Sequence, residues 1–233
     1  MRKQKIKLSN GYYEYTSIPL YLGIKLIDKE KSFDNLLLLK SILCEFDIDF
    51  ILAFGTLLGV VRDKDFISHD EDIDLIIWEK YKQKFFDLLP VMRNHGFEVA
   101  RYDRRSLISI IRNGEYIDIY FFKANEDGFD TSGAIFYPSY LIRETIDYEF
   151  KSSIFKVPKD YESYLEYEYG LDWRTPIKWN DFEMPQWKRN LYSFKERIKD
   201  YLPDSIFFLL AKHSEKKLYN RYVNLYNNFI KSH

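Results

Sequence analysis

Four acidic side chains lie within five consecutive positions, directly before and inside an apolar run. They are Asp70, Glu71, Asp72 and Asp74, within the stretch FGTLLGVVRDKDFISHDEDIDLIIW at residues 54–78. Isoleucine and leucine alternate with Asp72 and Asp74, which predicts a strand carrying both carboxylates on one face. Two carboxylates about 5 Å apart repel by about 3 kcal/mol at an effective dielectric constant of about 20. We therefore predict that Asp72 and Asp74 bind a hard cation, Mg²⁺ or Mn²⁺, although such pairs also occur on solvated surfaces.

A glycine turn precedes these acids. Gly55 and Thr56 follow a predicted buried strand at residues 49–54 and begin a predicted short helix. Backbone N–H groups and a hydroxyl at such a position suit a phosphate oxygen, so we predict a phosphate-binding turn. Arg62 lies between the turn and the acids. It could clamp a phosphate, pair with Asp70 or remain solvated.

Asp118 is the single acid within an apolar strand pattern at residues 115–122. A buried carboxylate needs a partner. One alternative is an ion pair with Arg112 or with another arginine across the hairpin. The other is a role as third metal ligand, from a strand next to Asp72 and Asp74. The metal interpretation fails if Asp118 points away from these two residues or is neutralised by an arginine.

His69 directly precedes the acidic run. Because imidazole titrates near neutral pH, His69 could act as general base or acid for an acceptor hydroxyl. The alternative is a structural role as a hydrogen-bonding partner of the neighbouring acids. Asp118 could also orient or deprotonate that hydroxyl.

Helical and strand patterns interleave along the chain. Predicted helices cover residues 30–47 and 79–95, and predicted strands cover residues 98–102, 107–112 and 115–122. Asn113-Gly114 predicts a tight hairpin between the last two strands. Pro158 precedes a helix that ends at Gly170, and a long basic helix follows Pro203. We predict an α/β (α+β) fold: a mixed sheet flanked by helices, with a helical C-terminal extension.

The composition is that of an ordinary globular protein. The 233 residues are 46% hydrophobic and 30% charged, and the formal net charge is −1. This charge argues against a surface built to bind nucleic acid, so we expect no such partner. The single Cys44 cannot form an internal disulfide, and the N-terminus lacks the apolar run of a signal peptide. We therefore expect a cytoplasmic protein.

The C-terminal region is basic. Residues 188–233 hold ten Lys and Arg against four Asp and Glu. Leu218, Tyr222, Leu225 and Phe229 recur at helical spacing, so an amphipathic helix could lie on the inner face of an anionic membrane. The alternative is a helix packed on the catalytic domain. We divide the chain into a catalytic domain, residues 1–187, and a basic helical extension, residues 188–233. Three tryptophans could stack on sugar rings or pack in the core, and we expect core packing for each: Trp173, Trp179 and Trp187.

The order of these motifs resembles the nucleotidyltransferase (polymerase-β-like) superfamily, and within it the LicD/fukutin branch. The central resemblance lies in FGTLLGVVR at residues 54–62 and FISHDEDIDL at residues 66–75. Residues 112–122 and 157–176 are similar to later segments of that family. Ser68, His69 and Glu71 stand where the family usually has Pro, Trp and Asp.

The resemblance implies a LicD-like, metal-dependent phosphotransferase. Such an enzyme moves a phosphorylated alcohol, such as phosphocholine, phosphoglycerol or phosphoribitol, from a CDP-activated donor to a sugar hydroxyl and releases CMP. The acceptor would be a cell-surface glycan, as in capsule or lipopolysaccharide biosynthesis, or a lipid-linked saccharide. Cations held by Asp72, Asp74 and Asp118 would stabilise the attacking and leaving oxygens. The alternatives are a glycosyltransferase using a nucleotide-sugar, a nucleotidyltransferase releasing pyrophosphate, and a non-catalytic binding module.

Overall fold

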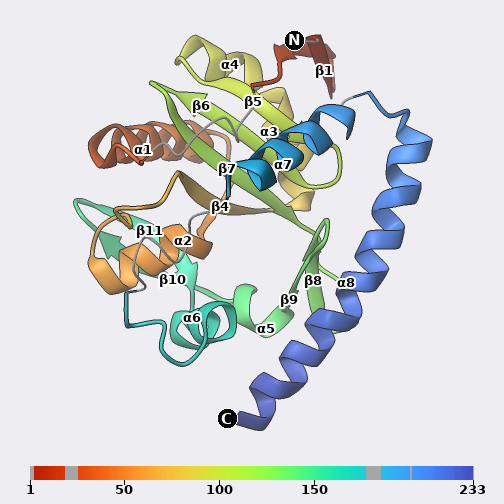
Figure 1. The fold of residues 1–233 in the computed structure, drawn as a ribbon. Helices are drawn as coiled ribbons and strands as arrows, with labels where there is room; N and C mark the ends of the chain where they lie inside the picture. The colour runs from red at the N-terminus through yellow and green to blue at the C-terminus, as the bar shows by residue number, and fades with distance from the viewer. Residues whose placement is uncertain (1–2, 19–25, 177–184, 200, 233) are drawn as a thin grey trace.

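A mixed seven-stranded sheet forms the scaffold of the protein (Figure 1). The computed structural model describes residues 3–18, 26–176, 185–199 and 201–232. The strand order is β10-β11-β3-β4-β7-β6-β5. The strands are β3 (Ile51–Leu52), β4 (Asp72–Trp78), β5 (Glu98–Asp103), β6 (Leu107–Arg112), β7 (Glu115–Phe122), β10 (Thr145–Phe150) and β11 (Ser153–Pro158). This arrangement confirms the predicted mixed α/β fold.

The two strands at the centre of the sheet, β4 and β7, run parallel to each other. Ile73, Leu75, Ile76 and Ile77 of β4 are completely buried, so this strand is covered on both faces along most of its length. β6 joins β7 through the predicted Asn113-Gly114 turn, in which both residues have positive φ angles of 53° and 81°. These values suit the tight hairpin turn that the sequence predicts.

Helices and short helical turns surround the sheet. They are α1 (Lys29–Glu45), α2 (Phe54–Leu58), α3 (Lys82–Asp87), α4 (Leu89–Asn94), α5 (Ser139–Ile142), α6 (Tyr161–Tyr169), α7 (Gln186–Lys199) and α8 (Asp204–Ser232). A π-helical turn (Gly59–Asp63) continues α2, and a 3-10 turn (Glu79–Tyr81) precedes α3. Two further hairpins form small sheets: β1 (Lys3–Leu8) with β2 (Gly11–Thr16), and β8 (Phe129–Ser132) with β9 (Ile135–Pro138).

Several elements differ from the sequence predictions. The predicted helix at residues 79–95 is divided into the 3-10 turn, α3 and α4, and Pro90 stands in the first turn of α4. Proline lacks the N–H that a continuous helix would need there. The predicted strand at residues 49–54 is reduced to two residues because Phe54, with φ of 46°, already begins α2. The hairpins β1–β2 and β8–β9 were not predicted, and the predicted helical extension, residues 188–233, is divided into α7 and α8.

The C-terminal half of α8 packs on the β8–β9 hairpin and α6 (Figure 1). Tyr219 contacts Phe136, with ring centroids 5.3 Å apart, and Phe229 contacts Tyr167 at 5.6 Å. Tyr222 also contacts Phe136. This confirms, for that half, the alternative of a helix packed on the domain. Within the described ranges, no helix combines the length and apolarity that crossing a membrane requires.

Candidate functional site

The segment between β3 and β4 positions the acidic residues through two small side chains. A Cβ atom at Gly55 would lie only 2.6 Å from Oδ2 of Asp70, so glycine allows this carboxylate to approach the turn. Thr56 is buried, and its Oγ1 accepts a hydrogen bond from the backbone N–H of Asp74 at 2.8 Å. Thr56 therefore fixes α2 against β4. Its hydroxyl oxygen accepts this bond, and its predicted contact with a phosphate stays a prediction.

Four polar residues form a row across the sheet. Asp74 of β4 lies opposite Asp118 of β7, Asp118 lies opposite Ser109 of β6, and Ser109 lies opposite Arg101 of β5. Residues in register on adjacent strands point to the same face. The guanidinium of Arg101 extends along this row: Nε donates to Oγ of Ser109 at 2.9 Å, and Nη2 donates to Oδ2 of Asp118 at 2.8 Å.

The ion pair between Arg101 and Asp118 is the alternative that the sequence left open, with Arg101 in place of Arg112. Arg112 instead donates to the carbonyl of His95 and to Oδ1 of Asn35. An arginine therefore neutralises Asp118, which is the condition named above for failure of the metal interpretation. The ion pair engages one oxygen of Asp118, Oδ2. Its other oxygen, Oδ1, is buried and has no hydrogen-bond partner among the described atoms.

As they lie, the described residues include no group of three His, Cys, Asp or Glu side chains that could hold a metal ion. The predicted centre of Asp72, Asp74 and Asp118 is thus not preformed, because Arg101 draws one oxygen of Asp118 along the row. This corrects the expectation that Asp72, Asp74 and Asp118 come together as one set of metal ligands. What remains of it is an acidic pair on β4 with one unsatisfied oxygen beside it.

Electrostatic strain is concentrated in the acidic run. Burial, followed by repulsion from Asp118 and Asp70, raises the pKa of Asp72 well above its usual value. Burial and repulsion from Asp72 raise the pKa of Asp74 in the same direction. Burial also raises the pKa of Asp70 to about 6, and the neighbouring Glu71 adds to this effect. Asp72 is partly exposed, and its pKa is still raised because like charges surround it.

The chemistry of this donor set fits a hard divalent cation. Carboxylate oxygens are the preferred ligands of Mg²⁺ and Mn²⁺. A cation between Asp72 and Asp74 would offset their mutual repulsion, and the unpaired Oδ1 of Asp118 could supply a further oxygen. Perturbed carboxylates of this kind are typical of functional sites.

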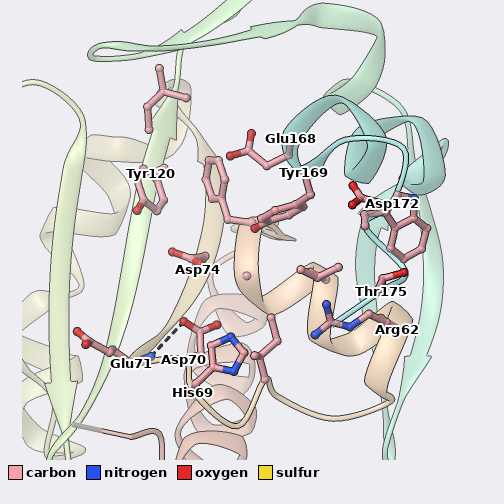
Figure 2. A pocket seen from close by; sticks show the side chains of 16 residues that line it. Arg62, His69, Asp70, Glu71, Asp74, Tyr120, Glu168, Tyr169, Asp172 and Thr175 are labelled. Atoms are coloured by element: carbon pink, nitrogen blue, oxygen red, sulfur yellow. Dashed lines mark hydrogen bonds between the residues drawn. The ribbon is translucent and has the colours of Figure 1, made fainter. Parts of the chain in front are cut away.

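A cavity of about 510 Å³ opens beside Asp74 (Figure 2). Its walls come from α2 and the π-helical turn, from the loop before β4, and from the end of α6 with the residues that follow. This volume lies within the range of small-molecule sites, about 300–1,000 Å³. Asp74 therefore lines a space large enough for a substrate, whereas Asp72, Asp118 and Thr56 are not among the residues that line it.

Of the predicted site residues, Gly55, Arg62, His69 and Asp74 line the cavity. Figure 2 shows His69 next to Asp70 on one wall. The guanidinium of Arg62 makes two hydrogen bonds to Asp63, at 2.8 and 2.9 Å. Its pairing partner is thus Asp63, whereas the sequence suggested Asp70.

Other lining residues escaped the sequence analysis. Tyr120 lies two residues after Asp118 on β7, so the period of the strand could have identified it. Glu168 and Tyr169 at the end of α6 carry no comparable signal, since only tertiary packing brings α6 to the sheet. The carboxylate of Glu168 accepts a hydrogen bond from Tyr137, and burial raises its pKa.

The predicted core tryptophans differ from one another. Trp173 is buried, as predicted, and also lines the cavity. Trp187 is exposed, so its prediction as a core residue is wrong. Trp179 lies outside the described residues.

Comparison with known proteins identifies the central part of the chain. Residues 47–160 match the family described as LicD/FKTN/FKRP, nucleotidyltransferase domain. The uncharacterized protein RT0683 of Rickettsia typhi is 25% identical over 177 residues, which cover 76% of this chain and 50% of that protein. The chain thus spans about half the length of this curated relative.

Solved structures show weaker similarity. The lincosamide antibiotic adenylyltransferase LnuA, bound to lincomycin, aligns with a TM-score of 0.44 and 14% identity, covering 70% of this chain and 94% of that one. ANT(2")-Ia in complex with adenylyl-2"-tobramycin aligns with a TM-score of 0.40 and 12% identity, covering 81% and 99% of the two chains. The assignment therefore depends on the family match, which confirms the resemblance over residues 47–160: this part of the chain is similar to the LicD/FKTN/FKRP nucleotidyltransferase-domain family.

Proposed function

We propose that this protein transfers a phosphorylated alcohol from a CDP-activated donor to a sugar hydroxyl, releasing CMP. The family assignment supports the coarser part of this statement, an enzyme of the phosphotransferase type. One observation carries the proposal furthest: Asp74, one of the two acids of β4 with raised pKa values, lines a cavity of about 510 Å³. Phosphoryl transfer depends mainly on positioning and charge stabilisation, so it needs no covalent nucleophile.

Asp72 and Asp74 are the residues that would hold Mg²⁺ or Mn²⁺, with Oδ1 of Asp118 as a further oxygen. When bound, the cation would supply charge neutralisation at the transferred phosphoryl group. Arg101 contributes a fixed positive charge on the far side of Asp118, at 2.8 Å from Oδ2. In this proposal Arg101 positions Asp118 and leaves only one of its oxygens for the site.

The remaining steps fall to other residues of the cavity. The acceptor hydroxyl oxygen forms a bond to the phosphorus that carries the alcohol, and the bond from that phosphorus to the CMP oxygen breaks. The hydroxyl proton passes to a base, for which we propose His69 because it lines the cavity beside the acids. The Gly55 turn and Arg62, which also line the cavity, would contact the donor phosphates.

A second candidate is nucleotidyl transfer with release of pyrophosphate. The description of the matching family as a nucleotidyltransferase domain favours it. The two reactions differ in the phosphorus that is attacked and in the leaving group, so their products separate them.

The test is mass spectrometry of the purified protein with Mn²⁺, CDP-choline, CDP-glycerol or CDP-ribitol, and candidate glycans. Release of CMP with the matching mass added to a glycan would support the proposal. Pyrophosphate from CTP or ATP would favour the second candidate, and UDP from UDP-sugars would indicate a glycosyltransferase. The Asp74→Asn variant is the control for contaminating activity. No turnover, together with no calorimetric binding of Mn²⁺ and nucleotide, would indicate a non-catalytic binding module.

A further inference from the structure

Helix α7 presents an apolar stripe that the described structure leaves exposed. Trp187, Leu191, Phe194 and Ile198 recur at intervals of four, three and four residues, which places them on one face of the helix. Between 42% and 64% of the surface of each is exposed. Large apolar side chains gathered in this way mark an interaction surface, whereas single exposed ones need no explanation.

The same helix is strongly basic. Its sequence, QWKRNLYSFKERIK, contains five Lys and Arg against one Glu. Lys188 and Lys195 flank the apolar stripe and are both exposed. An amphipathic helix with an aromatic and aliphatic face and basic flanks is the form that binds at the surface of an anionic bilayer.

A basic groove lies where α7 leads into α8. It has a volume of about 780 Å³, and its lining includes Tyr201 and Phe208 from the connection and the start of α8. Its charged lining residues are Lys3, Lys5, Lys7 and Arg104 against Asp204; Lys5 pairs with Glu14 and Arg104 with Asp204, so Lys3 and Lys7 supply the excess positive charge. The groove is therefore suited to an anionic group such as a lipid phosphate, and it begins directly after the apolar stripe.

Contacts with the catalytic domain hold this junction in place. Nη1 of Arg104 donates to the carbonyl of Leu202 at 2.9 Å and forms an ion pair with Asp204. Phe207 is buried, and Cζ of Arg104 lies over its ring, 4.0 Å from the ring centroid. The next residues of α8, Phe208, Leu209 and Leu210, are exposed. The junction thus presents apolar side chains from a fixed position.

We propose that α7 and its junction with α8 dock this protein on an anionic lipid membrane. The apolar stripe would enter the boundary between headgroups and acyl chains, and the basic residues would contact lipid phosphates. This surface differs from the stripe of Leu218, Tyr222, Leu225 and Phe229 suggested by the sequence, because Tyr222 and Phe229 already pack on the domain. The inference is independent of the reaction catalysed.

The test is co-sedimentation of the full chain with vesicles of phosphatidylcholine alone or mixed with phosphatidylglycerol. The chain offers a matched pair of variants, Ile198→Glu on α7 and Ile154→Glu on β11. The two isoleucines are similarly exposed, with 44% and 47% of their surface accessible. We expect binding to the anionic vesicles only, about tenfold weaker in Ile198→Glu and unchanged in Ile154→Glu. Lys188→Glu with Lys195→Glu should weaken binding and reduce its dependence on salt.

A second measurement distinguishes loss of membrane binding from misfolding of the variants. Trp187 fluorescence should shift to shorter wavelength on addition of anionic vesicles, and Trp187→Phe should abolish this shift while preserving the circular dichroism spectrum. The proposal is overturned if anionic vesicles do not bind, or if both isoleucine variants behave alike. It is also overturned if light scattering shows a dimer that Ile198→Glu dissociates, because a second copy of the chain would then cover the stripe.

Discussion

Asp130 of β8 and the pair Asp72 and Asp74 of β4 differ in whether hydrogen-bond donors or like charges surround their carboxylates. Asp130 of β8 is completely buried and accepts hydrogen bonds from Arg143, from Oγ of Ser139 and from the backbone N–H of Asn125. Asp72 and Asp74 of β4 have raised pKa values and repel each other. Satisfied carboxylates stabilise a local structure, whereas crowded ones destabilise it unless a cation is bound.

The difference separates a structural acid from candidate functional ones. Asp130 ties the β8–β9 hairpin to α5 and to the segment before β8, and its partners account for both of its oxygens. Asp74 of β4 instead lines a cavity, and Oδ1 of Asp118, its neighbour in register, has no hydrogen-bond partner among the described atoms.

The largest effect should come from Asp74→Asn. The substitution keeps the shape of the side chain but removes the charge that would hold a cation, so turnover should fall by about a thousandfold or more. Asp72→Asn should behave in the same way. Steady-state kinetics of CMP release measure the effect, and Asp130→Asn with normal turnover per folded molecule is the control. Activity near that of the wild type in Asp74→Asn would remove this residue from the mechanism.

The converse change is Asp130→Ala. It should cost about 2–3 kcal/mol of unfolding free energy, because a buried serine hydroxyl and a backbone N–H lose their acceptor. Urea denaturation of the metal-free protein gives this value. Asp74→Asn in the same assay should be neutral or stabilising. Equal destabilisation by both variants would contradict the distinction between the two groups.

Divalent cations should stabilise the folded protein through Asp72 and Asp74 and not through Asp130. At a Mn²⁺ concentration about 100 times its dissociation constant, the unfolding free energy should rise by about 2.7 kcal/mol. Thermal unfolding with and without Mn²⁺ measures the gain. The gain should be lost in Asp72→Asn and preserved in Asp130→Asn. An equal gain in all three proteins would place the cation elsewhere.

Stability of the metal-free protein should depend on pH through the crowded acids. A carboxyl whose pKa is raised by folding stabilises the fold below its unfolded pKa and loses that contribution as pH rises through its folded pKa. For Asp70 the folded pKa is about 6. The unfolding free energy should therefore fall by about 1–2 kcal/mol between about pH 4 and pH 6. Urea titrations in EDTA test this, and Asp70→Asn should flatten the profile; a rise over this interval would contradict it.

The smallest effect concerns Arg101. Arg101→Lys should lower turnover by about tenfold, because lysine cannot span Ser109 and Asp118 with two fixed N–H groups. Ser109→Ala is the matched control, since it removes one partner of Arg101 and keeps the ion pair. Calorimetry adds a second measurement: freeing Oδ2 of Asp118 in Arg101→Ala should tighten Mn²⁺ binding. Unchanged Mn²⁺ binding in that variant would contradict a place for Asp118 in the cation site.

The sequence predicted much of the local structure around the site. Alternation along β4 identified Asp72 and Asp74 on one face, and Asn113-Gly114 identified the hairpin that leads into β7. Local preferences suffice there, because strand period and turn chemistry are properties of a few adjacent residues. The sequence did not indicate that Thr56 is buried and accepts a hydrogen bond from the backbone N–H of Asp74, because tertiary packing creates that contact.

By itself, the sequence determined that acids would share one face of a central strand next to a glycine turn, and that β7 would bring one more acid beside them. Only the tertiary structure decided which partner that acid takes: the register of four strands aligns Asp74, Asp118, Ser109 and Arg101 in one row. It also brought α6 to the cavity and left the stripe of α7 uncovered. These features depend on contacts between residues far apart in the chain, and the spacing of residues within one element carries no information about them.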